Sequence, residues 1–192
     1  MVPEFIVVHN TANDASAANE IAYMIRNDNA TSFHYAIDDK EIIQGIPENR
    51  NAWHAGDGNG PGNRKGISIE ICYSLSGGPK FIAAEKLAAK FVAFKLKEEG
   101  WDISKVKKHQ DFSGKYCPHR TLDMGWQRFL DMVQAELKGG SAVAADKNTP
   151  SAWAKGAWDW AKEKGYLDGN RPKDNLTREE FAVVIKKLVD RK

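Results

Sequence analysis

The fold is decided by the stretch Phe5-Ile6-Val7-Val8-His9, a continuous apolar and largely β-branched run that ends in a histidine. Such a run predicts a strand that is buried on both faces at the centre of a sheet. A second strand is predicted at residues 67–73, where Glu70 stands between two isoleucines. Functional groups at the ends of such strands often form the site of an α/β protein.

Outward from these strands, strand-like and helix-like segments alternate, which predicts an α/β fold with a mixed central β-sheet flanked by helices. Residues 34–37 and 41–46 flank the turn Asp38-Asp39-Lys40 and predict a hairpin. Residues 49–65 are rich in Gly, Asn and Pro and predict a long loop, which in a compact domain is usually functional. Three helices are predicted. The first follows a cap at Asp14 or Ser16 and carries an apolar face made of Ala18, Ile21, Ala22 and Ile25. The second runs from about Ile82 to Glu99 and ends at Gly100, and the third runs from Trp126 to Leu137.

The chain of 192 residues divides at a stretch of small residues that opens with a Gly pair. This stretch predicts a linker at residues 139–150 between a front domain, residues 1–138, and a small helical C-terminal domain, residues 151–192. All five His and both Cys lie between His9 and His119. We therefore expect the chemistry in the front domain and binding in the tail.

Composition excludes several classes of protein. Lys and Arg number 28 against 26 Asp and Glu, so a nucleic-acid binder driven by bulk charge is excluded. Two Cys are too few for a disulfide scaffold. No run of about 18 apolar residues is present, so no membrane insertion is expected. The first ten residues lack the cationic start of a signal peptide, which predicts synthesis in the cytoplasm.

The densest group of metal-ligand residue types runs from His109 to Cys117. An imidazole and a thiolate suit zinc, and a catalytic zinc needs three protein ligands and an open position. His9, at the end of the first strand, is a candidate for the third ligand. The alternative for His9 is a structural role as a hydrogen-bonded residue. A Cys can instead act as a small buried hydrophobe, which is the preferred interpretation for Cys72. A disulfide between Cys72 and Cys117 is a further alternative.

Two further side chains are candidates for the chemistry. Glu70 is either a solvated residue at a strand edge or a base whose pKa is raised by desolvation. Lys115 lies two residues before Cys117, so a metal site there would place its ammonium beside a developing oxyanion. The alternative for Lys115 is a solvated loop residue.

Four segments together resemble the type-2 N-acetylmuramoyl-L-alanine amidases, a family that includes phage endolysins and the peptidoglycan recognition proteins. They are Val7-Val8-His9-Asn10-Thr11-Ala12, Ser32-Phe33-His34-Tyr35, Trp53-His54-Ala55-Gly56 and His109 to Pro118 with Lys115-Tyr116-Cys117. The resemblance covers residues 4–137. Residues 49–53, 56–63 and 70–74 are most similar to endolysins of phages that infect Gram-positive, spore-forming bacteria.

The resemblance implies a type-2 amidase fold and zinc-dependent hydrolysis of the amide bond between N-acetylmuramic acid and L-alanine. It implies that Zn²⁺ is held by His9, His109 and Cys117, that Glu70 is the catalytic base, and that Lys115 stabilises the tetrahedral intermediate. The cleft would be lined by His34, Trp53 and His54. Phe33 stands where other members place a Tyr, and Phe has no hydroxyl for proton transfer. This departure gives the base role to Glu70, or leaves the zinc-activated water to react with little assistance from a protein base.

The tail resembles a single S-layer homology repeat, from Trp153 to Ala182. Such repeats bind anionic secondary wall polymers, which implies that Trp153 and Arg178 contact the polymer. They usually occur in threes, so one copy implies weak affinity or dimerisation. The alternative is that Arg178 pairs with a neighbouring carboxylate.

The leading hypothesis is an endolysin that acts on bacterial peptidoglycan and secondary cell-wall polymer, as a monomer or weak dimer. It would be made in the host cytoplasm without a signal peptide and reach the wall through a holin-type membrane pore. The alternatives are a non-catalytic peptidoglycan recognition protein, which would lack the Cys ligand, and a cytoplasmic muropeptide-recycling amidase, which would need no wall-binding tail.

Overall fold

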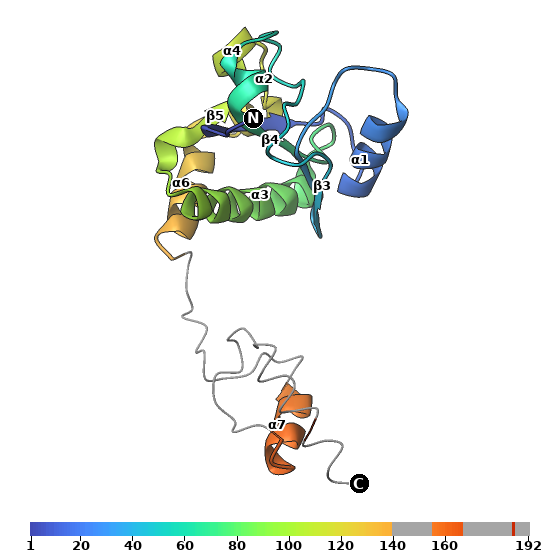
Figure 1. Cartoon of the computed structure of the whole chain (residues 1–192), viewed down its shortest axis with the longest axis vertical. Coiled ribbons are helices and arrows are strands. Elements are labelled where there is room, and N and C mark those ends of the chain that lie inside the picture. The colour runs from blue at the N-terminus through green and yellow to red at the C-terminus, as the bar shows by residue number, and fades with distance from the viewer. Residues whose placement is uncertain (140–154, 167–185, 187–192) are drawn as a thin grey trace. The chain divides into compact units, whose positions relative to one another are not determined.

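The computed structural model describes residues 1–139, 155–166 and 186 (Figure 1). The chain separates into two compact units, Met1–Gly140 and Ser141–Lys192. Within the described residues of the second unit lies one helix, α7 (Lys155–Glu163), after which Tyr166 packs against Trp160. The predicted wall-polymer residues Trp153 and Arg178 lie outside the described residues.

The first unit is built on a five-stranded sheet in the order β3-β2-β4-β1-β5. The strands are β1 (Phe5–Asn10), β2 (Tyr35–Ile37), β3 (Ile42–Gln44), β4 (Gly66–Ile71) and β5 (Val106–Lys108). β1 pairs in parallel with β4 and β5, β2 pairs in parallel with β4, and β3 pairs antiparallel with β2. The predicted mixed sheet and its hairpin are confirmed.

The central position predicted for the first strand is also confirmed. Ile6, Val7 and Val8 are fully buried, because β1 has a neighbour on each edge and packed side chains on both faces. The parallel register pairs His9 of β1 with Glu70 of β4. The same strand pairing therefore brings two candidate site residues side by side at the carboxyl ends of these two strands.

Three longer helices complete the first unit. α1 (Ala17–Arg26) starts at Ser16, whose side chain caps it, and packs near β2 and β3. α3 (Gly78–Glu99) packs against β2 and β4 and against α6 (Trp126–Leu137), beneath the sheet in the view of Figure 1. α3 ends as predicted at Gly100, whose φ of 68° is the left-handed conformation that glycine adopts readily.

Several details of the sequence prediction are wrong. α3 begins at Gly78 rather than near Ile82, since a proline is tolerated in the first turn. The buried face of α1 carries Ala17, Glu20 and Ile21, whereas Ala18 and Ile25 are exposed. The segment 49–65 is not all loop, because its end forms α2 (Pro61–Lys65).

Four short elements were not predicted. They are the 3₁₀ helix η1 (Ile103–Lys105), β5, α4 (Gln110–Ser113) and α5 (His119–Asp123). Each has three to five residues, too few for a periodic apolar pattern. Among the described residues, no helix combines the length and apolar character needed to cross a membrane.

Candidate functional site

The candidate site forms where three parallel strands end. His9 is near the end of β1, Glu70 near the end of β4, and His109 directly follows β5. Cys117 reaches the same place from the segment between α4 and α5, where its carbonyl accepts the backbone N–H of Gln110 at 3.0 Å. The parallel sheet thus gathers residues that are up to 108 positions apart in the sequence.

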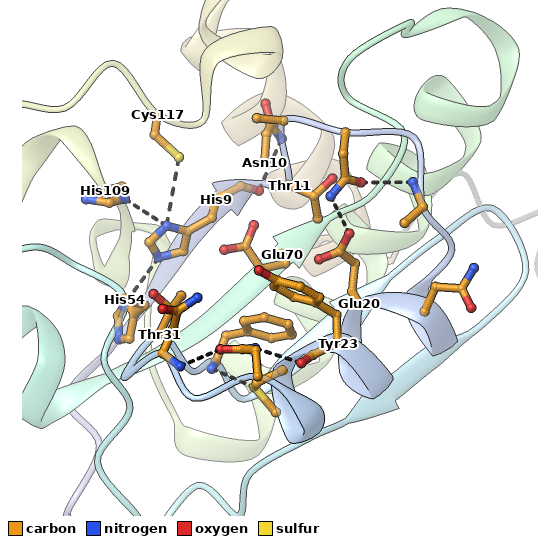
Figure 2. Close-up of a pocket in the computed structure, with 18 of the residues that line it drawn as sticks. His9, Asn10, Thr11, Glu20, Tyr23, Thr31, His54, Glu70, His109 and Cys117 are labelled. Atoms are coloured by element: carbon orange, nitrogen blue, oxygen red, sulfur yellow. Dashed lines mark hydrogen bonds between the residues drawn. The ribbon is translucent and has the colours of Figure 1, made fainter.

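The three residues predicted as metal ligands lie together and are buried (Figure 2). The Nδ1 atoms of His9 and His109 are 3.0 Å apart, and Cys117 Sγ lies 3.8 Å from His9 Nδ1. All three donor atoms fall within 4.8 Å of one another. Two imidazole nitrogens and one sulfur at this separation are a donor set that fits a zinc ion with an open coordination position.

The protonation of this cluster suits a metal site. Burial lowers the pKa of His9 and of His109, and nearby positive groups, including Lys115, lower both further. Burial and then the charge of Glu70 raise the pKa of the Cys117 thiol to about 12. The imidazoles are therefore neutral at pH 7, whereas a metal must displace the thiol proton.

The cluster forms one end of a pocket of about 540 Å³. Glu70 and Lys115 both line it, and Lys115 is otherwise exposed to solvent. The opposite wall comes from α1 and the segment that follows it, as Figure 2 shows for Glu20, Tyr23 and Thr31. The pocket therefore extends from the metal-ligand cluster to α1.

Glu70 has the electrostatics of a proton-transfer group. Its Oε2 atom is buried and has no hydrogen-bond partner within the described residues. Burial and the nearby Glu20 raise the pKa of Glu70 to about 8, against an opposing effect of Lys115. Of its two interpretations, the solvated edge residue does not fit this environment.

Glu20 is a pocket residue that the sequence analysis missed. It is buried, and its Oε1 accepts a hydrogen bond from Asn13 Nδ2 at 2.6 Å. Burial raises its pKa. A signal was present, since Ser16 as N-cap places position 20 on the same face as Ala17 and Ile21, but this phase of the helix was not predicted.

The three residues predicted to line the cleft lie in different environments. His54 lines the pocket, and its Nδ1 is 3.0 Å from His9 Nε2. Trp53 is 47% exposed and lines a separate, smaller depression. His34 is fully buried away from the pocket, because its ring contacts Ser68 Oγ at 2.9 Å and the Arg50 carbonyl at 2.9 Å and thereby ties β2 to β4.

Two further predictions concern apolar positions. Cys72 is fully buried in the core, and Cys72 and Cys117 are both free, so the alternative of a disulfide between them is wrong. Phe33 lines the pocket from the side of α1 and is almost fully buried. It supplies an apolar wall without a hydroxyl.

Comparison with known proteins agrees with this geometry. The N-acetylmuramoyl-L-alanine amidase family matches residues 1–120. The chain is 63% identical over 156 residues to the amidase XlyB of Bacillus subtilis and 60% identical over 164 residues to the amidase CwlA of the same organism. These alignments cover 80% and 81% of this chain but only 49% and 60% of the relatives, so the chain spans about half of their length.

Solved structures show the same fold. PlyL is similar with a TM-score of 0.68 and 55% identity, covering 69% of this chain and 84% of PlyL. The catalytic domain of XlyA is similar with a TM-score of 0.64 and 41% identity, covering 69% of this chain and 87% of that domain. The mixed sheet, the helices around it and the sequence match lead to one conclusion: the chain belongs to the N-acetylmuramoyl-L-alanine amidase family.

Proposed function

We propose that this chain is a zinc-dependent peptidoglycan hydrolase of the endolysin type, which cleaves the amide bond between N-acetylmuramic acid and L-alanine. The observation that carries the proposal is the cluster of His9 Nδ1, His109 Nδ1 and Cys117 Sγ at one end of a pocket that also holds Glu70 and Lys115. Relatives named as N-acetylmuramoyl-L-alanine amidases support the reaction class.

His9, His109 and Cys117 would hold the metal. Bound there, zinc would supply the Lewis acidity that makes water a competent nucleophile near pH 7. Cys117 would give up its proton to the solvent when the metal is held, whereas the two neutral imidazoles would need no such change. The presence of Cys117 disfavours the alternative of a non-catalytic recognition protein.

Glu70 would act as general base and then as general acid. Its unpartnered Oε2 is free to accept a proton from the attacking water, and its raised pKa suits return of that proton to the leaving amine. The Lys115 ammonium would stabilise the negative charge that develops on the carbonyl oxygen. Replacing Glu70 by Gln should lower kcat about 10²-fold or more and leave zinc binding intact.

We propose three roles for the residues predicted to bind substrate. His54 lines the reacting end of the pocket, Trp53 offers an exposed apolar face to a more distant part of the substrate, and His34 supports the site by joining β2 to β4. The tail, with Trp153 and Arg178, would bind an anionic secondary wall polymer as an S-layer-homology-like module, and the protein would act as a monomer or weak dimer.

The test is incubation of the full chain with purified sacculi, with and without a chelator. We expect new N-terminal alanine, no new reducing sugars, loss of activity with the chelator and recovery with added zinc. New reducing ends without new amino termini would overturn the amidase assignment. Cleavage of small soluble muropeptides but not of sacculi would favour the recycling amidase instead.

A further inference from the structure

The loop before α2 contacts both metal-ligand imidazoles. Its residue His54 places Nδ1 at 3.0 Å from His9 Nε2. Two residues later, Gly56 has a φ of 68°, and a Cβ there would lie 3.4 Å from His109 Nε2 and 3.0 Å from Ser113 Oγ. The backbone of this loop therefore passes directly behind the ligand cluster.

The contact between His54 and His9 occupies the His9 ring nitrogen that does not face His109 Nδ1 and Cys117 Sγ. His9 Nδ1 must carry a free lone pair if it is to bind a metal beside His109 Nδ1 and Cys117 Sγ. The proton of the neutral His9 ring then lies on Nε2, which donates to His54 Nδ1. An outer partner of this kind fixes both the tautomer and the direction of a metal-binding imidazole.

His54 is itself held by one buried side chain. Asn63 Oδ1 accepts the backbone N–H of His54 at 2.8 Å and that of Ala55 at 2.7 Å. Asn63 Nδ2 donates to the Gly58 carbonyl at 2.9 Å, so the Asn63 amide uses both of its ends within the loop. Asn63 is 2% exposed, too little for ready competition from solvent water.

Asp57 holds Asn63 in turn. Its Oδ1 accepts the backbone N–H of Asn63 at 3.1 Å, and its Oδ2 accepts that of Gly62 at 2.7 Å. The Asn63 clamp is the name used below for the Asn63 side chain bonded to the backbone N–H groups of His54 and Ala55. Asp57 holds this clamp in place. A Cβ at Gly62 would lie 2.5 Å from the Ala55 Cβ, so α2 packs against the clamped loop without room for a side chain.

We propose that Asn63 is a positioning residue of the metal centre, which orients the His9 imidazole through the backbone and ring of His54. Asn63 does not line the pocket that holds the ligand cluster, and it acts only through the clamp. The inference rests on the proposed function, because it assumes that His9, His109 and Cys117 bind zinc.

The test compares three substitutions in the full chain. Asn63→Ala removes both accepted hydrogen bonds, whereas Asn63→Asp keeps an accepting oxygen but puts a carboxylate oxygen in place of the donor to Gly58. Asn59→Ala changes an exposed Asn of the same loop and is the matched control. The zinc dissociation constant is measured by competition with a chromophoric chelator, the ligand geometry by the visible spectrum of the cobalt-loaded protein, and stability by thermal unfolding in excess chelator.

We expect Asn63→Ala to weaken zinc binding about threefold or more and to change the cobalt spectrum, a smaller loss than the roughly tenfold typical when the partner that contacts a ligand directly is removed. Asn63→Asp should keep the parental zinc affinity and cobalt spectrum even where its melting temperature falls, and Asn59→Ala should match the parent throughout. If Asn63→Ala does not fold, Asp57→Asn replaces it, with a smaller loss of zinc affinity expected.

Three results would overturn the proposal. The first is an Asn63→Ala protein that is less stable than the parent but binds zinc with the parental affinity, because the clamp would then have a purely structural role. The same outcome counts for Asp57→Asn if that variant is used instead. The second is an equal loss in Asn63→Ala and Asn63→Asp, because the accepted bonds would then not be what matters. The third is a parent that binds no zinc, which would remove the proposed function as well, whereas the first two leave it standing.

Discussion

Cys117 keeps its proton in the metal-free protein, since burial and Glu70 raise the pKa of its thiol to about 12. Zinc binds the thiolate, so uptake of zinc at pH 7 must release this proton. In a Glu70→Gln background, where that carboxyl cannot contribute, we expect release of about one proton per zinc. Calorimetry in buffers of different ionisation enthalpy measures it.

The control for proton release is Cys117→Ser in the same background. A serine hydroxyl does not ionise at pH 7, so this variant should bind zinc more weakly and release about one proton fewer per zinc than the Cys117 form. Equal proton release by the two forms would contradict the assignment of the sulfur as a ligand.

Glu70 makes stability depend on pH in a direction that follows from its environment. Its pKa is raised to about 8 in the folded protein, so the folded state resists ionisation that the unfolded chain accepts above about pH 4.5. The cost of a buried Glu70 is therefore absent at low pH, grows as the pH rises to about 8, and is constant above that value.

We accordingly expect Glu70→Gln to stabilise the metal-free protein at pH 8 and to leave its stability unchanged near pH 4. Chemical unfolding in excess chelator at a series of pH values measures the difference, with Glu41→Gln, at an exposed turn, as the matched control. A Glu70→Gln protein that is less stable than the parent at pH 8 would show that the Glu70 carboxylate is stabilised in the fold.

At the scale of elements, α3 and α6 are joined by an ion pair between a buried carboxylate and a partly exposed guanidinium. Glu85 on α3 is 1% exposed, and Arg128 Nη2 on α6 lies 2.6 Å from its Oε2. Removing Arg128 leaves the buried Glu85 carboxylate without its cation; this costs about 3 kcal/mol at a fully buried pair and less here, because the Arg128 side chain is 35% exposed, whereas replacing both by apolar groups costs much less.

We therefore expect Arg128→Met to lower the free energy of unfolding by about 1–2 kcal/mol. The double variant Glu85→Met, Arg128→Met should be more stable than Arg128→Met alone. Urea unfolding of the four proteins of this cycle gives the coupling energy. Additive losses in the double variant would mean that the pair does not act as a unit.

How much of these elements could be predicted depended on their length and burial. The run at residues 5–9 has neighbours on both edges and faces, so its apolar pattern was unambiguous and β1 was found. β5 and α2 have three and five residues, and their formation depends on contacts with β1 and on the Asp57 side chain. Such contacts leave no periodic signal in the sequence.

Only some residues of the candidate site could be predicted from their type. His9, His109 and Cys117 were found because their residue types and the family resemblance both indicate zinc. Glu20 and Asn63 were missed, because a carboxylate on a helix and an amide in a Gly-rich loop are ordinary surface residues until tertiary packing buries them. Conversely, His34 has a suitable residue type but is held within the sheet.

At the scale of the whole chain, the near-neutral net charge conceals an uneven distribution. Residues 141–192 contain 11 Lys and Arg against 8 Asp and Glu, whereas residues 1–140 contain 17 against 18. A basic tail favours association with an anionic polymer, and such attraction between exposed charges weakens as salt screens it. The charge of the tail thus supports the wall-binding role proposed for it.

Deleting residues 141–192 should therefore separate binding from catalysis. We expect the truncated chain to cleave soluble muropeptides as the full chain does, because His9, Glu70, Lys115 and the other pocket residues all belong to Met1–Gly140. Its activity on intact sacculi should fall roughly tenfold, since a second attachment raises the local enzyme concentration at the wall.

Full-length Arg178→Ala should show part of the same loss. The comparison uses sacculi before and after hydrofluoric acid removes the phosphate polymer, at low and high salt. Equal activity of the two chains on untreated sacculi at low salt would assign the tail a role other than wall binding.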